Sequence, residues 1–247
     1  VLDAFGNHVT ADALTTARLR VINSASSAVT PSYATGLSKQ ASGGYITFDN
    51  LSLGLLADTY SLEVLASTYS GEAIAGSLGG NSSQFEITPG AITAIQVVTP
   101  AATAKAGTAF AQQPVIRVVD ADGSVVPTDA TISARVSQVT TIGTSASAAV
   151  DGIANFSGLG LGASGAIGDY AITYTLNNNG NLITTTQNIE VIAGDAAKLQ
   201  IVQQPTAKKT GSSFSSSVTV RLLDAFNNPV TISNAITATA TLVSFSG

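Results

Sequence analysis

Acidic residues that follow a strand-like run are the first candidates for chemistry in this sequence. Asp120-Ala121-Asp122-Gly123 begins like a calcium loop, in which alternate oxygen ligands share a cation. No glutamate follows at the twelfth position, so the segment also fits a turn in which Asp120 accepts backbone N–H groups. Both interpretations stay open, and the weak calcium candidates are Asp120, Asp122 and Asp195.

Two further features resemble known functional sites in residue type or spacing but lack the rest of what those sites need. Gly160-Leu161-Gly162-Ala163-Ser164-Gly165 has the spacing of the dinucleotide fingerprint, which needs a helix after it. A strand-like run begins near Tyr170 instead, so we predict a loop whose glycines let the chain cross between sheets. His8 is the single histidine and there is no cysteine, so we expect no common zinc site and place His8 in an exposed turn. The sequence predicts no catalytic residue and no cofactor site, and hence a protein that is not an enzyme.

The amino-acid composition limits the kinds of partner that we expect for this chain. Charged residues make up 10% of the 247 residues, against roughly 25% in an average domain, while hydrophobic residues reach 45%. The net charge is −5, and the Lys and Arg residues, 10 together, are scattered, so the basic footprint of a nucleic-acid-binding protein is absent. No apolar run reaches the roughly 18 residues of a membrane span. We expect an internal segment of a longer protein, with no nucleic-acid partner and no membrane span.

The hydrophobic period is two, as in half-buried strands. Apolar and polar residues alternate in Val218–Leu222 and in Tyr60–Val64. Residues 172–176 and 182–184 flank Asn177-Asn178-Asn179-Gly180, which predicts a hairpin because Asn and Gly tolerate positive φ. No segment has a helical stripe, so the chain is predicted to be all-β.

Three segments of the chain align with one another. They are VLDAFGNHV from Val1, VVDADGSVV from Val118 and LLDAFNNPV from Leu222, and their aspartates are Asp3, Asp120 and Asp224. Outside these segments Gly90 matches Gly194, and Tyr60 matches Tyr170. Co-linear matches of this kind indicate a repeated module.

The repeat predicts three modules. Residues 1–89 form a module that lacks its first strands, residues 90–193 form a complete one, and residues 194–247 form one truncated at its C-terminus. In the complete module we expect an inward-facing set: Ile95, Val97, Phe110, Ile116, Val118, Phe156, Leu159, Tyr170, Ile172, Tyr174, Ile189 and Val191.

These residues also carry a family resemblance. The pattern runs from AGTAFAQQPVIRVVDADGSVV through IANFSGLGL and GDYAITYTL to IEVIAGDAAKLQIV. It resembles the bacterial immunoglobulin-like, invasin-type tandem repeats of large cell-surface adhesins and extracellular filament proteins. The resemblance implies tandem immunoglobulin-like antiparallel β-sandwiches without significant helix. It also implies an extracellular location on the bacterial cell surface.

Three functions stay open at this point. The leading one is a structural or adhesive segment of a large repetitive surface protein, acting as a semi-rigid stalk or adhesive array. A second is a subunit of a self-assembling extracellular filament or surface layer. A third is an accessory or carbohydrate-binding module of a secreted enzyme, for which Tyr33, Tyr69 and Phe226 are the aromatic residues expected at the surface. Expected partners are neighbouring repeats, other copies of the chain, and a cell-surface or glycan ligand.

Overall fold

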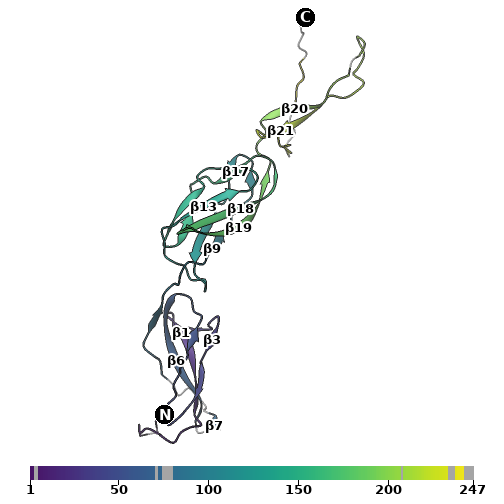
Figure 1. Cartoon of the computed structure of the whole chain (residues 1–247). Coiled ribbons are helices and arrows are strands. Elements are labelled where there is room, and N and C mark those ends of the chain that lie inside the picture. Colours follow the sequence, from purple (N-terminus) through teal and green to yellow (C-terminus); the bar gives the residue numbers. More distant parts are fainter. Residues whose placement is uncertain (3–4, 70–71, 74–79, 207, 233–236, 242–247) are drawn as a thin grey trace. The chain divides into compact units, whose positions relative to one another are not determined.

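A computed structural model shows the arrangement of the strands (Figure 1). It describes residues 1–2, 5–69, 72–73, 80–206, 208–232 and 237–241, with the side chains of 67–69 and 72–73 left undescribed. These residues form strands and contain no helix, as the period of two predicts. None of them belongs to a helix long and apolar enough to cross a membrane.

The chain divides into two compact units. The first comprises Val1–Gln96, Arg117–Thr128 and Val150–Gly152, and the second comprises Val97–Ile116, Asp129–Ala149 and Ile153–Gly247. The division of the sequence into three modules stays a prediction.

The first unit is centred on a long antiparallel pair of strands. Its six-stranded sheet has the order β2–β1–β6–β7, with β4 paired to β1 and β8 paired to β6. The bounds are β1 Thr16–Asn23, β2 Ala28–Val29, β4 Ser38–Gln40, β6 Asp58–Tyr69, β7 Glu72–Ala73 and β8 Phe85–Ile87. A separate two-stranded sheet pairs β3 (Ala34–Thr35) with β5 (Ser52–Leu53).

The largest sheet has eight strands in the order β10–β19–β18–β13–β15–β16–β12–β9. Their bounds are β9 Ala94–Thr99, β10 Ala104–Lys105, β12 Val115–Val119, β13 Thr131–Val136, β15 Ala146–Val150, β16 Ile153–Asn155, β18 Gly168–Asn178 and β19 Asn181–Ile192. β10 runs parallel to β19, a departure from the purely antiparallel pairing that we expected.

Two small sheets lie within the second unit. One has three strands, β11 (Thr108–Ala109), β17 (Gly162–Ser164) and β14 (Thr140–Ile142), with β17 in the middle. The other is the hairpin of β20 (Lys198–Gln203) and β21 (Thr219–Leu223). β17 lies inside the glycine-rich segment where we predicted a loop. Gly162 permits this strand, because a Cβ there would come within 2.2 Å of the Thr108 carbonyl oxygen.

The hairpin predicted around Gly180 is confirmed. β18 and β19 pair antiparallel from Gly168 opposite Val191 to Asn178 opposite Asn181, and Asn179 and Gly180 form the two-residue turn with φ values of +53° and +91°. The Asn177 side chain supports the turn by accepting a hydrogen bond from the Gly180 N–H at 2.7 Å. This is the positive-φ turn that suits the twist of paired strands.

Strand registers recur between the two units. Leu19 lies opposite Val64 and Val21 opposite Leu62, just as Ala134 lies opposite Tyr174 and Val136 opposite Ile172. Each of these second-unit partners on β18 lies 110 positions after its counterpart on β6. The matching registers show that one pairing scheme is used twice.

A tyrosine is fixed in the same way in both units. The Tyr60 hydroxyl donates to the Leu56 carbonyl at 2.9 Å, and the Tyr170 hydroxyl donates to the Ala166 carbonyl at 2.9 Å. In each case the acceptor lies four residues earlier in the loop that enters the long strand. This bond anchors the loop to the strand that follows it.

The predicted core is largely confirmed. Nine of the twelve residues expected to face inward are buried, and Val97, Leu159 and Tyr170 are half-buried. Phe156 and Tyr174 pack with ring centroids 6.2 Å apart. The first unit has a smaller buried cluster of Val21, Leu55 and Tyr60.

Candidate functional site: two carboxylate junctions

The segment after β12 is a turn organised by one carboxylate. Asp120 Oδ1 accepts hydrogen bonds from the N–H groups of Asp122 at 3.0 Å and Ser124 at 2.8 Å. The Asp120 N–H donates to the Ser124 carbonyl at 3.0 Å, and Gly123 takes a φ of +90° that suits glycine. The predicted structural turn is therefore present.

The same turn holds two distant segments of the first unit. Asp120 Oδ2 accepts the Gly90 N–H at 2.8 Å, and Ser124 Oγ accepts the Ala57 N–H at 2.8 Å. Gly90 begins the predicted complete module, whereas Ala57 precedes the long strand β6. One aspartate and one serine therefore tie a connector and a preceding loop to the turn. We call Asp120, Ser124, Gly90 and Ala57 the first junction.

The second unit contains the equivalent arrangement after β21. Asp224 Oδ1 accepts the N–H groups of Phe226 and Asn228, each at 2.8 Å, and Oδ2 accepts the Gly194 N–H at 2.9 Å. Asn228 Oδ1 accepts the Ile167 N–H at 3.2 Å. We call Asp224, Asn228, Gly194 and Ile167 the second junction, since each lies at the position that matches the first.

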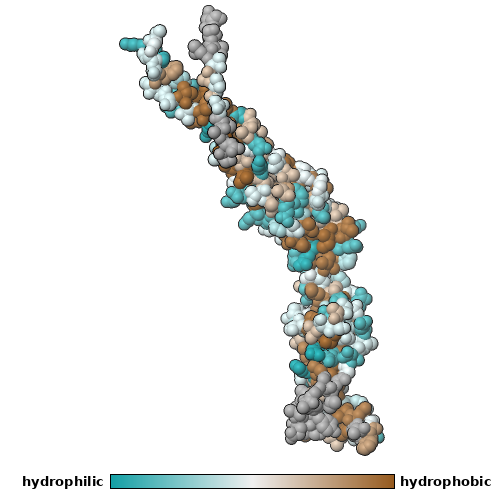
Figure 2. Space-filling model, turned by 180° about the vertical axis from the view of Figure 1, so that it is seen from behind, coloured by the Kyte–Doolittle hydropathy of each residue, from teal (hydrophilic) through white to brown (hydrophobic). Residues whose placement is uncertain are grey.

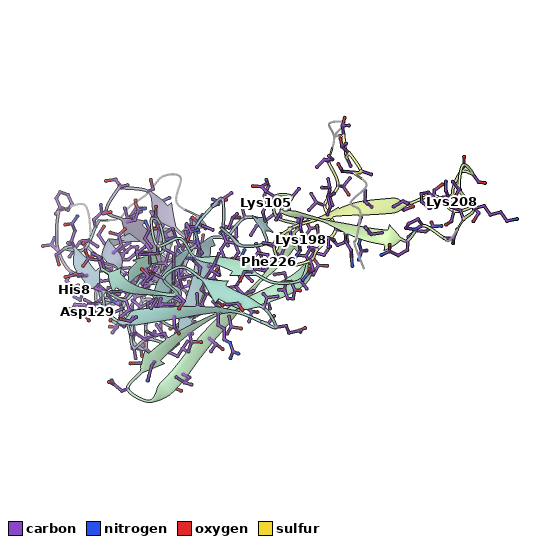
Figure 3. The ribbon with its side chains drawn as sticks, turned by 90° about the horizontal axis from the view of Figure 1, so that it is seen from above. His8, Lys105, Asp129, Lys198, Lys208 and Phe226 are labelled. Carbon is purple, nitrogen blue, oxygen red and sulfur yellow. The ribbon has the colours of Figure 1, made fainter. Side chains whose placement is uncertain are left out.

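Asn228 makes more bonds than its counterpart Ser124. Its Nδ2 donates to the Gly165 carbonyl at 2.8 Å and to Asp224 Oδ2 at 2.8 Å. In this junction the Phe226 ring lies against Gly107, where a Cβ would come within 2.5 Å of the ring. Figure 3 shows Phe226 and Lys198 at one end of the β20–β21 hairpin and Lys208 at the other.

Both carboxylates are held in the ionised form. Hydrogen bonds from backbone N–H groups, that of Gly90 above all, lower the pKa of Asp120. Burial raises the pKa of Asp224, but the bonds from Asn228, Gly194 and Phe226 outweigh it, so the pKa of Asp224 is also lowered. A carboxylate that accepts several N–H bonds stabilises its charge without a counter-ion.

The calcium candidates lie in different units, Asp120 and Asp122 in the first and Asp195 in the second. Asp120 turns both oxygens toward N–H donors, an arrangement that a cation would not favour. Asp195 forms an ion pair with Lys105 at 2.7 Å, beside an open hollow of about 1020 Å³ that Gly194 also lines. Asp122, the third candidate, is exposed. In the part of the chain that the structure describes, no three His, Cys, Asp or Glu side chains gather as metal ligands.

Other residues singled out from the sequence lie apart from the junctions. Tyr33 is exposed as expected, and its ring lies against Gly54. Phe226 is partly exposed, while the Tyr69 side chain and Asp3 lie outside the described residues. The placement of His8 in an exposed turn was wrong: His8 is half-buried and packs against Tyr45, with ring centroids 4.2 Å apart and ring planes tilted by 48°.

The turn aspartates were found from the sequence, but their long-range partners were not. Gly90 and Gly194 align as a pair, yet alignment alone does not indicate that their N–H groups reach a carboxylate 30 residues later. The signal available was that glycine and aspartate keep the same separation in both copies. Ser124 and Asn228 differ in type, which concealed their common role.

Comparisons with known proteins give little more. No family model matches the chain, and no curated protein matches it. Among solved structures, one that matches is titled "Biofilm associated protein - BSP domain", with 18% identity and a TM-score of 0.28. The match covers 75% of this chain and 26% of that one. A likeness at this TM-score carries no argument about fold or function, so the function has to be inferred from the residues of this chain.

Proposed function

We propose that the chain is a structural, adhesive segment of a large repetitive extracellular surface protein of bacteria, working as a semi-rigid stalk rather than as an enzyme. The observation that carries this proposal is the junction built twice from equivalent positions. In each, a carboxylate binds the N–H of the glycine that opens the next predicted module, at 2.8 Å and 2.9 Å. A connector fixed in this way limits rotation between modules.

The module in question is best interpreted as an immunoglobulin-like sandwich. The two tyrosines that donate to a carbonyl four residues upstream match the corner found at the start of a late strand in such domains. The recurring strand registers support one unit used repeatedly. A tandem series of modules with separate cores has a stability that is mainly a sum over modules and their interfaces.

The proposed stalk function depends on two properties of such an array: its length and the number of weak contacts that its modules make. The connectors around Gly90 and Gly194 are short, and their carboxylate bonds are charge-assisted, which makes them stronger than neutral hydrogen bonds. A stiff array holds its far end away from the cell, and many weak contacts along it add through effective concentration. Low surface charge suits contact with several kinds of surface.

Spin-label distances test the rigidity. The chain has no cysteine, so Thr47→Cys and Thr131→Cys, both at exposed positions, give one label on each side of the first junction. We expect a narrow distance distribution that broadens in Asp120→Ala, because Gly90 and the turn lose their shared acceptor. Asp122→Ala is the matched control and leaves the width unchanged. A broad distribution in the unmodified chain would rule out a semi-rigid junction.

The surface location has its own test. Protease treatment of intact cells that produce the protein releases peptides of this segment if it lies outside the cell. Protection of the segment until the cells are lysed contradicts an extracellular stalk, whatever the stiffness of its junctions.

A further inference from the structure

The short strand β10 lies beside the end of β19 in the second unit, and the two strands run parallel. In their register Ala104 is opposite Val191 and Lys105 is opposite Ile192. The Ala106 N–H then donates to the Ile192 carbonyl at 2.8 Å. In the order of the eight-stranded sheet β10 stands at one edge, next to β19. A segment near the start of the predicted complete module is thereby bonded to the strand that ends this module.

The Gln187 side chain lengthens this contact by two more hydrogen bonds. Its Oε1 accepts the Ala101 N–H at 3.0 Å, and its Nε2 donates to the Ala101 carbonyl at 2.7 Å. The Tyr174 hydroxyl donates to the same Oε1 at 3.1 Å and holds the amide in place. The amide therefore bonds the Ala101 backbone as a neighbouring strand would. We call residues 101–106 together with Gln187, Val191 and Ile192 the parallel clasp.

Buried side chains shield the parallel clasp from water. Ala101, Ala104, Ala106 and Val191 are all buried. Figure 2 shows teal, hydrophilic residues on the visible face of the middle part of the chain, where the surface is in contact with water. Hydrogen bonds in a low-dielectric surrounding are electrostatically stronger than bonds that water reaches. The bonds of the clasp are therefore better protected than those of an exposed edge strand.

After β10 the chain stays bonded to the rest of the second unit. The Gly107 N–H donates to the Ala163 carbonyl, and the Phe110 N–H donates to the Leu161 carbonyl, each at 2.8 Å. Gly107 takes a φ of +83°, which suits glycine and lets the chain pass from the large sheet to the small sheet of β11 and β17. β10 is thus held at both of its ends, by Gln187 before it and by these bonds after it.

The parallel direction of the two strands decides how the clasp responds to tension. Tension along the chain reaches β10 through the residues before Ala101 and leaves β19 through the residues after Ile192. In a parallel pair these two points lie at opposite ends of the contact, so the strands are pulled along their own axes and their hydrogen bonds are loaded together. The free ends of the antiparallel β18–β19 hairpin lie at one end, so pulling on them would break its bonds one after another.

We propose that the parallel clasp is the load-bearing element of the second unit, and that Gln187 adds to its mechanical strength. Under tension along the chain, the strands stay folded until the backbone bonds of the clasp and the two bonds of Gln187 break in one event. The proposal deepens the stalk function proposed above and rests on it for its purpose, because a stalk is under tension whenever the surface that it holds is pulled. The mechanical property itself follows from contacts within the second unit.

Single-molecule force spectroscopy of the full 247-residue chain tests the clasp. The chain has no cysteine, so handles can be attached at chosen positions. Pro100→Cys with Ala196→Cys, both at exposed positions, loads the clasp along its strands. Pro100→Cys with Asn181→Cys puts the second handle at the start of β19, so that β10 is peeled away from its first residue onward. We expect a higher unfolding force with the first pair of handles. Equal forces, or a higher force with the second pair, overturn the proposal.

Gln187→Ala tests the part played by the side chain. It removes both bonds to Ala101, so with handles at positions 100 and 196 we expect the unfolding rate at a fixed force to rise about tenfold. With handles at 100 and 181 the rise is much smaller, because the bonds then break separately. Thr186→Ala, at an exposed neighbouring position on β19, is the matched control and leaves both rates unchanged.

An equal rise in the two pulling directions would show a general loss of stability and would remove Gln187 from the load-bearing element. If Gln187→Ala does not fold, the two handle pairs in the otherwise unmodified chain still decide whether the clasp bears load. A chain that fails this test but gives a narrow spin-label distance would keep its stiff first junction, so the clasp and the proposed stalk fail separately.

Discussion

The first and second junctions use the same backbone arrangement with different side chains around it. Asp120 and Asp224 both accept a glycine N–H, but Ser124 reaches the preceding loop through one bond where Asn228 uses two. The second junction also packs Phe226 against Gly107, where the first has the exposed Asp122. The comparison teaches that the aspartate and glycine define the junction, while the neighbouring positions set its strength.

Removing the carboxylate should have the largest effect on both junctions and should show most clearly that they differ in stability. Asp224→Ala leaves the N–H groups of Gly194, Phe226 and Asn228 without their acceptor in a buried site, so we expect a loss of about 3 kcal/mol in local stability. Asp120→Ala also leaves three N–H groups without their acceptor, but this carboxylate is slightly more exposed and accepts no bond from a side chain. We therefore expect a smaller loss of local stability, about 2 kcal/mol. Amide exchange at Gly194 and Gly90 measures both losses. Equal losses would contradict the ranking.

The connector glycines should respond unequally to a methyl group. A Cβ at Gly194 would lie 2.7 Å from the Ala106 carbonyl oxygen, which is backbone and cannot easily yield. At Gly90 the nearest atom would be Asp120 Oδ2 at 3.6 Å, an ordinary contact. We expect Gly194→Ala to destabilise the second unit by about 2 kcal/mol and Gly90→Ala to have little effect, as read by thermal unfolding. A costly Gly90→Ala would mean that this connector is also tightly packed.

The side chains of Asn228 and Ser124, which occupy equivalent positions, can be swapped between the two junctions by substitution. Asn228→Ser removes the donor to the Gly165 carbonyl and should cost about 1 kcal/mol. Ser124→Asn offers the first junction the same donor. If the side chain alone sets the strength, Ser124→Asn slows amide exchange at Ala57, while Asn228→Ser speeds it at Ile167. If neither amide exchange rate changed, the difference in strength between the two junctions would have to come from the backbone and not from the side chains of Ser124 and Asn228.

The sequence predicted local features well and long-range ones poorly. The hairpin at Gly180 and the Asp120 turn follow from the conformational preferences of Asn, Gly and Asp over a few residues. The Gly90–Asp120 bond joins residues 30 positions apart, and no local preference specifies it. His8 was misplaced because its burial depends on Tyr45, which is distant in the chain. β17 was missed because glycine is a poor strand former unless another backbone approaches it, as that of Thr108 does.

Lowering the pH should weaken both junctions, and we expect this effect on stability to be smaller than that of any of the substitutions above. The pKa values of Asp120 and Asp224 are lowered in the folded chain, whereas in the unfolded chain each carboxyl returns to its ordinary value of 3.8. Their stabilisation is therefore fully present above that value and is lost as pH falls through the lower, folded pKa. We expect a flat contribution between about pH 5 and pH 8 and a decline below about pH 4. Asp12, whose pKa is lowered chiefly by the Thr15 hydroxyl, acts in the same direction.

The variants isolate the junction part of this decline. In Asp120→Ala and Asp224→Ala, amide exchange at the matching glycine should no longer depend on pH beyond the intrinsic rate, because the titrating acceptor is gone. Asp122→Ala retains the decline, since its exposed carboxyl accepts none of the junction's N–H bonds. If acid weakened Gly90 protection equally in Asp120→Ala and in the unmodified chain, another group would be titrating, and the carboxylate would not be what holds the connector.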